Sequence, residues 1–86
     1  MVQSEFVDSK YKSYLGDLGP ILKELALEHR AERDAAAADS EQRAFSLGVL
    51  MGFHEVISIL QQQADAFQIG RQELGLEDIE PDRDLV

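Results

Sequence analysis

The chain of 86 residues has room for one small domain, and its 17 acidic residues against 8 basic ones give it a net charge of −9. This balance argues against direct binding to nucleic acid, because phosphate groups are bound by clustered lysine and arginine. The sequence contains no cysteine, so disulfide bonds and thiolate metal sites are excluded.

No segment has the pattern of a membrane span or of a secretion signal. The longest uncharged run around the most apolar segment extends from Ala44 to His54, whereas a membrane span needs about 18–20 apolar residues. The first residues include Glu5 and Asp8 and show no basic start followed by an apolar run, unlike a signal peptide. We therefore expect a cytoplasmic protein that does not bind membranes.

The first predicted helix covers residues 4–15. Its apolar side chains recur at helical spacing, at Val7, Tyr11, Tyr14 and Leu18. Gly16 and Gly19 then interrupt the pattern, and Pro20 suits the first turn of a new helix. These residues predict a bend at 16–19.

A second helix is predicted for residues 19–37. Its first half has an apolar stripe, and its second half is rich in alanine, which is the strongest helix former. His29 lies on the stripe near Glu28 and Glu32. We expect this histidine at the edge of the core, with a carboxylate as its hydrogen-bond partner.

The third predicted helix, residues 40–69, carries the strongest signal in the chain. Asp39 and Gln42 have the spacing of a capping box, and Gly70 can end the helix in a left-handed conformation. The main apolar stripe consists of Phe45, Val49, Phe53, Val56, Ile57, Leu60, Ala64 and Phe67. The alternative is one continuous helix of about fifty residues through the alanine run, although so long a pattern usually lacks internal caps.

The C-terminal residues divide into two parts. Leu74, Leu76 and Ile79 are expected to fold back onto the helices, which makes residues 1–79 a single helical domain. Residues 80–86 are predicted to be an extended, solvated acidic tail, because Pro81 disfavours helix at the residue before it.

The predicted class is all-α, with a short N-terminal helix followed by an antiparallel helical hairpin. Two helices do not cover the third segment, which is apolar over more than one face, so we expect a homodimer resembling a four-helix bundle. The alternative is a monomer closed by the N-terminal helix. Gly48 and Gly52 indicate a close helix crossing, and the candidate residues for this crossing or dimer contact are Phe45, Gly48, Val49, Gly52, Phe53, Val56 and Leu60.

No pattern of catalytic, cofactor-binding or metal-binding residues is found. His54 and Glu55 begin a zinc-protease motif, but Ser58 stands where the second histidine is required. No arrangement of serine, histidine and acid, and no glycine-rich phosphate loop, stands out. We expect neither an enzyme nor a cofactor nor a metal ion.

A second line of residues on the third helix is a candidate partner-binding surface. Leu47, Met51, His54 and Ser58 follow one another about one turn apart, opposite the main stripe. The predicted function is protein–protein contact, as an adaptor or regulatory binding module. The alternative is an inhibitor, or an antitoxin or immunity-type protein, that blocks a basic site such as a nucleic-acid-binding site on another protein.

Overall fold

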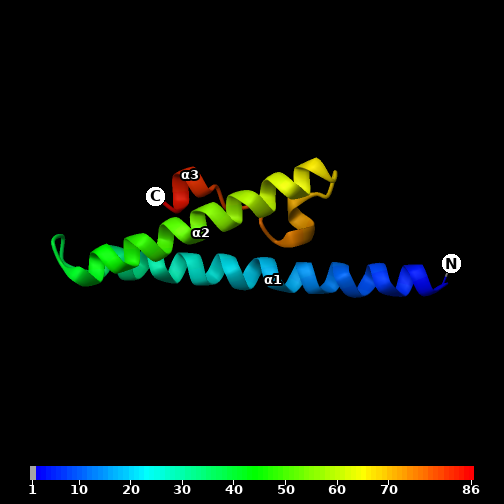
Figure 1. Cartoon of the computed structure of the whole chain (residues 1–86), viewed down its shortest axis with the longest axis horizontal. Helices are drawn as coiled ribbons and strands as arrows, with labels where there is room; N and C mark the ends of the chain where they lie inside the picture. The colour runs from blue at the N-terminus through cyan, green and yellow to red at the C-terminus, as the bar shows by residue number, and fades with distance from the viewer. Residues whose placement is uncertain (1) are drawn as a thin grey trace.

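The computed structural model describes the backbone from Val2 to Val86 and the side chains from Ser9 to Val86, so the side chain of Val7 lies outside the described part. Over this range the protein is all-helical, which confirms the predicted class. The elements are α1 (Val2–Ala35), α2 (Glu41–Ala66), the 3₁₀ turn η1 (Arg71–Leu74) and α3 (Pro81–Asp84). Figure 1 shows α2 running back along α1, with η1 between the C-terminal end of α2 and α1. The molecule is elongated, measuring 58 × 19 × 16 Å.

The predicted bend at residues 16–19 is wrong, because α1 continues without interruption through Pro20. A proline inside a helix removes one backbone hydrogen bond and normally weakens the helix. Here the C-terminal residues pack against this turn of α1. A Cβ atom on Gly19 would lie 1.8 Å from the carbonyl oxygen of Leu74, and one on Gly75 would lie 2.6 Å from Cγ of Pro20. The glycines therefore allow two backbone segments to approach closely. The helices predicted for residues 4–15 and 19–37 form a single helix, α1.

A turn over residues 36–40 separates α1 from α2 and excludes the single fifty-residue helix. The N-cap of α2 is Ser40, one residue later than predicted, and its side chain accepts a hydrogen bond of 3.1 Å from the N–H of Arg43. Arg43 in turn donates to the carbonyl oxygens of Arg33 (3.2 Å) and Ala36 (3.3 Å). The first turn of α2 thus adds hydrogen bonds to carbonyl groups at the end of α1 and in the turn that follows it.

The end of α2 also differs from the prediction. Gln68, with φ 58°, takes the left-handed conformation that was expected of Gly70. The N–H of Ile69 donates to the carbonyl oxygen of Ala64 at 2.8 Å, and that of Gln68 donates to Asp65 at 3.1 Å. This is the Schellman pattern, and it ends α2 at Ala66, three residues before the predicted boundary.

The core overlaps only one edge of the predicted apolar stripe, since Ile57 and Ala64 are buried and Phe53 and Leu60 pack against the core. Leu50, which is outside that stripe, is fully buried together with Ile57, whereas Phe45 and Phe67 are 65% and 72% exposed. The core consists of Ala26, Leu50, Ile57, Ala64, Leu74, Leu76, Ile79 and Leu85, with Phe53, Leu60 and Ile69 packed against it. Half of the fully enclosed core side chains therefore come from the segment that follows α2.

This C-terminal segment, residues 70–86, folds along one side of the α1–α2 pair. The predicted burial of Leu74, Leu76 and Ile79 is confirmed. The predicted extended and solvated tail is wrong, because Pro81 and Leu85 are buried and Pro81 begins α3. Proline has no N–H to lose at the first position of a helix, so it starts α3 there.

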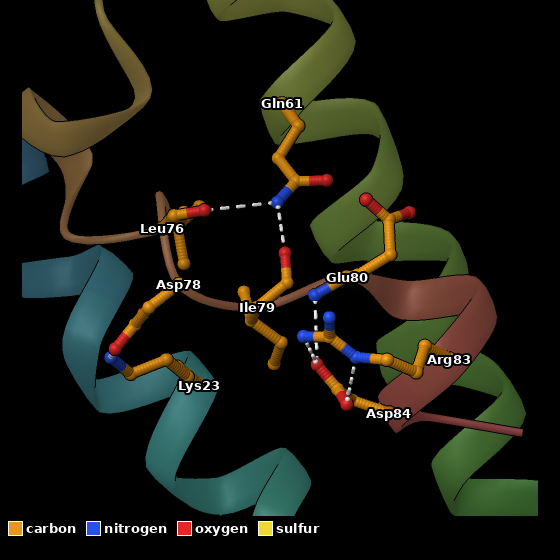
Figure 2. Close-up of polar contacts among 8 residues, drawn as sticks. All are labelled: Lys23, Gln61, Leu76, Asp78, Ile79, Glu80, Arg83 and Asp84. Atoms are coloured by element: carbon orange, nitrogen blue, oxygen red, sulfur yellow. Dashed lines mark hydrogen bonds and ion pairs between the residues drawn. The ribbon is translucent and has the colours of Figure 1, made fainter.

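Figure 2 shows three of the polar contacts that attach this segment to the long helices. The side-chain amide of Gln61, which is buried, donates to the carbonyl oxygens of Leu76 (3.0 Å) and Ile79 (2.8 Å). Lys23 of α1 contacts the carboxylate of Asp78 at 2.8 Å. The segment is thus tied to both helices, from the same side of the pair.

Candidate partner-binding surfaces

The four predicted partner-binding residues lie together on one wall of a groove. Leu47, Met51, His54 and Ser58 of α2 face residues of α3 and the chain that follows it, and the groove encloses about 750 Å³. We call this the α2–α3 groove; its lining residues are Leu47, Met51, His54, Glu55, Ser58, Ile59, Gln62, Asp82, Leu85 and Val86. Met51 is 62% exposed. The apolar surface that α2 presents along the groove, which we call its floor, is therefore accessible.

A side-chain contact connects the two walls of the groove. Nε2 of His54 lies 2.9 Å from Oδ1 of Asp82. Ser58 is one helical turn from His54, yet no hydrogen bond joins these two side chains among the contacts of the described residues. A serine nucleophile needs a base within hydrogen-bond reach. We interpret His54 as a structural contact between α2 and α3. The expectation that the protein is not an enzyme stays a prediction.

The charged groups that line the groove are mostly acidic. Glu55 on α2 and Asp82 on α3 carry carboxylates, His54 is the single basic group, and neither lysine nor arginine belongs to the lining. Among the described residues, no group of three or more histidine, aspartate or glutamate side chains could hold a metal ion. The groove combines an apolar floor with a negative rim.

A second apolar surface lies on another flank of the long helices. In α1, Tyr11, Tyr14, Leu18, Ile21 and Leu25 recur at steps of three and four residues, and both tyrosines are 64% exposed. In α2 the same spacing connects Phe45, Val49, Gly52 and Val56. We call these two stripes, together with Gly48, the open face.

The two stripes of the open face lie on the same side of the α1–α2 pair. The C-terminal segment touches Lys23 and Arg30 on α1 and His54 and Gln61 on α2. With a turn of about 100° per residue, each stripe lies on the far side of its helix from these contacts, and the buried core residues lie between the two. Because one segment covers one side of the α1–α2 pair, both stripes belong to the uncovered side.

The glycines of the open face have no close neighbour in the chain. A Cβ atom on Gly48 or Gly52 would meet nothing within 4 Å. No helix of the same chain crosses at these residues, since α1 packs against another flank of α2, and a crossing with another chain stays a prediction. Two further candidates for this contact, Phe53 and Leu60, are partly buried against the core of the same chain.

The α1 half of the open face was not among the predicted contact residues. The predicted bend at residues 16–19 divided this stripe between two helices. The signal that identifies them is the continuation of the three-and-four spacing from Tyr11 to Leu25, across the glycines and proline that predicted a bend. That spacing is typical of the a and d positions at helix–helix interfaces.

By length and composition alone, α2 qualifies to cross a membrane, and 22% of the qualifying stretch is buried inside the protein. The core helices of soluble proteins pass the same test. The two buried polar residues of α2 are hydrogen-bonded within the chain: Gln61 to the C-terminal segment, and Ser46 to Gln42 at 3.1 Å. The absence of a membrane span stays a prediction.

His29 lies at the edge of the core, as expected, and stacks on the ring of Phe53 with the ring centroids 5.6 Å apart. Its Nδ1 is 3.2 Å from Oε2 of Glu32, but without the alignment of a hydrogen bond. The predicted hydrogen bond to a carboxylate is therefore not formed, and the histidine connects α1 to α2 through its ring.

Acid should loosen the α3 wall of the groove. Hydrogen bonds from Arg83 and from the N–H of Glu80 hold the pKa of Asp84 well below its ordinary 3.8. A carboxyl whose pKa is lower in the folded protein stabilises it above the unfolded pKa, and this contribution is lost as the pH falls toward the folded value.

We therefore expect Asp84→Asn to lower the melting temperature at pH 7, and the difference from the wild type to shrink steadily below about pH 4. Thermal unfolding followed by circular dichroism from pH 7 to pH 2 measures this. Glu77→Gln is the control, because this exposed side chain has no ion pair among the described residues. A difference for Asp84→Asn that is constant with pH would contradict the expectation.

Comparisons of the chain with protein-family models, with curated proteins and with solved structures find no match. The function is therefore inferred from the open face and the α2–α3 groove.

Proposed function

We propose that the protein is a non-catalytic, homodimeric protein-binding module. The observation that supports this proposal is the open face, where two helices of one chain present apolar stripes on the side that the C-terminal segment leaves uncovered. Soluble monomers rarely expose a continuous apolar surface larger than a few hundred Å². A partner surface is the usual reason for one.

A second copy of the chain fits the open face well. In a two-fold dimer each chain would supply α1 and α2 as a helical hairpin, and the two hairpins would form a bundle of four long helices. Gly48 and Gly52 leave space for a neighbouring helix to come close, since nothing in the chain occupies it. Each glycine costs about 1 kcal/mol of helix stability relative to alanine, so a close contact would explain its presence.

The mass of the protein in solution tests this proposal. We expect light scattering at micromolar concentration to give twice the chain mass of 9.6 kDa. Val56→Glu should produce a monomer, because each dimer would then bury two carboxylates in an apolar interface. Gly52→Leu should also weaken the dimer, although leucine is the better helix former.

Met51→Glu is the matched control, because it places the same charge on α2 but in the α2–α3 groove, and the dimer should persist. A wild-type mass of one chain at all concentrations would refute the dimer. Flotation of that monomer with neutral liposomes would assign the open face to lipid instead.

The acidic rim of the α2–α3 groove supports the alternative function, an inhibitor or antitoxin or immunity-type protein that blocks a basic site. The net charge of −9 would attract such a site over about one Debye length, roughly 8–10 Å at physiological salt. Charge complementarity acts mainly on the association rate, and close contacts act on dissociation. The two functions thus differ in how strongly salt slows the binding of the partner.

A further inference from the structure

The geometry points to a specific occupant of the α2–α3 groove: a basic amphipathic helix of a partner protein. This inference rests on the proposed function, a protein-binding module, and names the class of partner. It concerns a different flank of α2 from the open face, and its lining residues are distinct from those of the open face.

The floor of the groove has the shape and chemistry for apolar side chains. Leu47 and Met51 are exposed on α2, and Val86 supplies apolar surface from the other wall. Methionine is flexible and polarizable, so it adapts to the shape of an incoming side chain. From Leu47 to Gln62 the floor extends about 22 Å along α2, which matches a partner helix of about 15 residues.

The carboxylates at the rim of the groove favour a partner with positive charge. Glu55 carries no ion pair among the described side chains, and Asp82 is 85% exposed although it also contacts His54. The nearby basic side chains Lys23 and Arg83 are engaged by Asp78 and Asp84. Lysine or arginine beside the apolar side chains of a partner would therefore find the carboxylate of Glu55 on one wall and the exposed carboxylate of Asp82 on the other.

The same charges disfavour the other occupants. The rim would repel an anionic membrane, and it would also repel the acidic rim of a second copy of the chain. Helix-in-groove recognition uses apolar anchors at positions i, i+3 or i+4 and i+7 of the bound helix. A helix with such anchors and a lysine-rich opposite face satisfies both the floor and the rim.

Three fluorescein-labelled peptides of about 15 residues, the length that spans the floor, test the inference. The first is an amphipathic helix of leucine and lysine, the second replaces every lysine by glutamate, and the third has the composition of the first in an order without helical periodicity. Fluorescence anisotropy with the full chain should show tight binding of the first peptide alone. Binding should weaken at least tenfold between 50 mM and 500 mM salt.

Variants locate the site. Leu47→Ala combined with Met51→Ala should weaken binding of the first peptide at least tenfold, and Glu55→Lys at least threefold. Val56→Ala, a truncation on the open face, should leave it unchanged. Equal binding of the acidic or the non-periodic peptide would overturn the inference, and so would an effect of Val56→Ala as large as that of the groove variants.

The two proposals fail in different ways. The mass of each variant, measured in the same samples, reports the dimer independently of peptide binding. Loss of peptide binding with an unchanged dimer for the double groove variant supports the inference. A dimeric wild type that binds none of the peptides refutes the inference and leaves the dimer standing, whereas a monomer that binds the basic peptide refutes only the dimer.

Discussion

Replacing Gly19 by alanine is expected to destabilise the protein by about 2 kcal/mol or more, although alanine is the better helix former by about 1 kcal/mol. The added Cβ would lie 1.8 Å from the carbonyl oxygen of Leu74 and 2.9 Å from its carbonyl carbon. Both atoms belong to the backbone, so η1 must move away from α1. For a domain of this size, the melting temperature should fall by about 10 °C or more.

Gly16→Ala is the matched control, one turn earlier in the same helix. Its Cβ would be 3.4 Å from the carbonyl oxygen of Glu73, an ordinary contact distance, so we expect a small gain in stability. Thermal unfolding of both variants measures the difference, and amide hydrogen exchange should show faster exchange in residues 71–86 for Gly19→Ala alone. A Gly19→Ala variant as stable as Gly16→Ala would mean that η1 does not pack against α1 in this way.

Gln61→Ala is the second substitution with a large expected effect. Its amide supplies the hydrogen bonds to the buried carbonyl oxygens of Leu76 and Ile79, at 3.0 and 2.8 Å. An unsatisfied buried carbonyl group costs about 1–3 kcal/mol, so the loss of both bonds should lower the free energy of unfolding by about 2–4 kcal/mol. Urea unfolding measures this change.

Gln63→Ala provides the comparison, because Gln63 lies two residues further along α2 and is exposed. Its effect should stay within about 0.5 kcal/mol, as for most surface substitutions. If the two variants unfold at the same urea concentration, Gln61 does not hold the C-terminal segment, and the α3 wall of the groove would need another attachment.

The C-terminal segment determines where both candidate surfaces are. By covering one side of the α1–α2 pair, it leaves the stripes of the open face uncovered on the other side. Its last residues, Asp82, Leu85 and Val86, also form one wall of the α2–α3 groove. Weakening the attachment at Gly19 or Gln61 should therefore impair peptide binding in the groove, while the side chains of the open face remain in place on α1 and α2.

Several features of the protein follow from the sequence itself. The helical class, the extent of α2 to within a few residues at each end and the folding back of Leu74, Leu76 and Ile79 were all predicted. The alignment of Leu47, Met51, His54 and Ser58 on one line of α2 was predicted as well. These features depend on helical period, capping and apolar content, which act between residues a few positions apart.

The tertiary structure decided what those local rules leave open. Gly19 and Pro20 are breakers by local preference, yet α1 continues through them because a distant segment packs there. The buried flank of α2 centres on Leu50 because the C-terminal segment binds beside it through Gln61. A helix with apolar residues over more than one face does not specify which face is covered; contacts with residues far along the chain determine that.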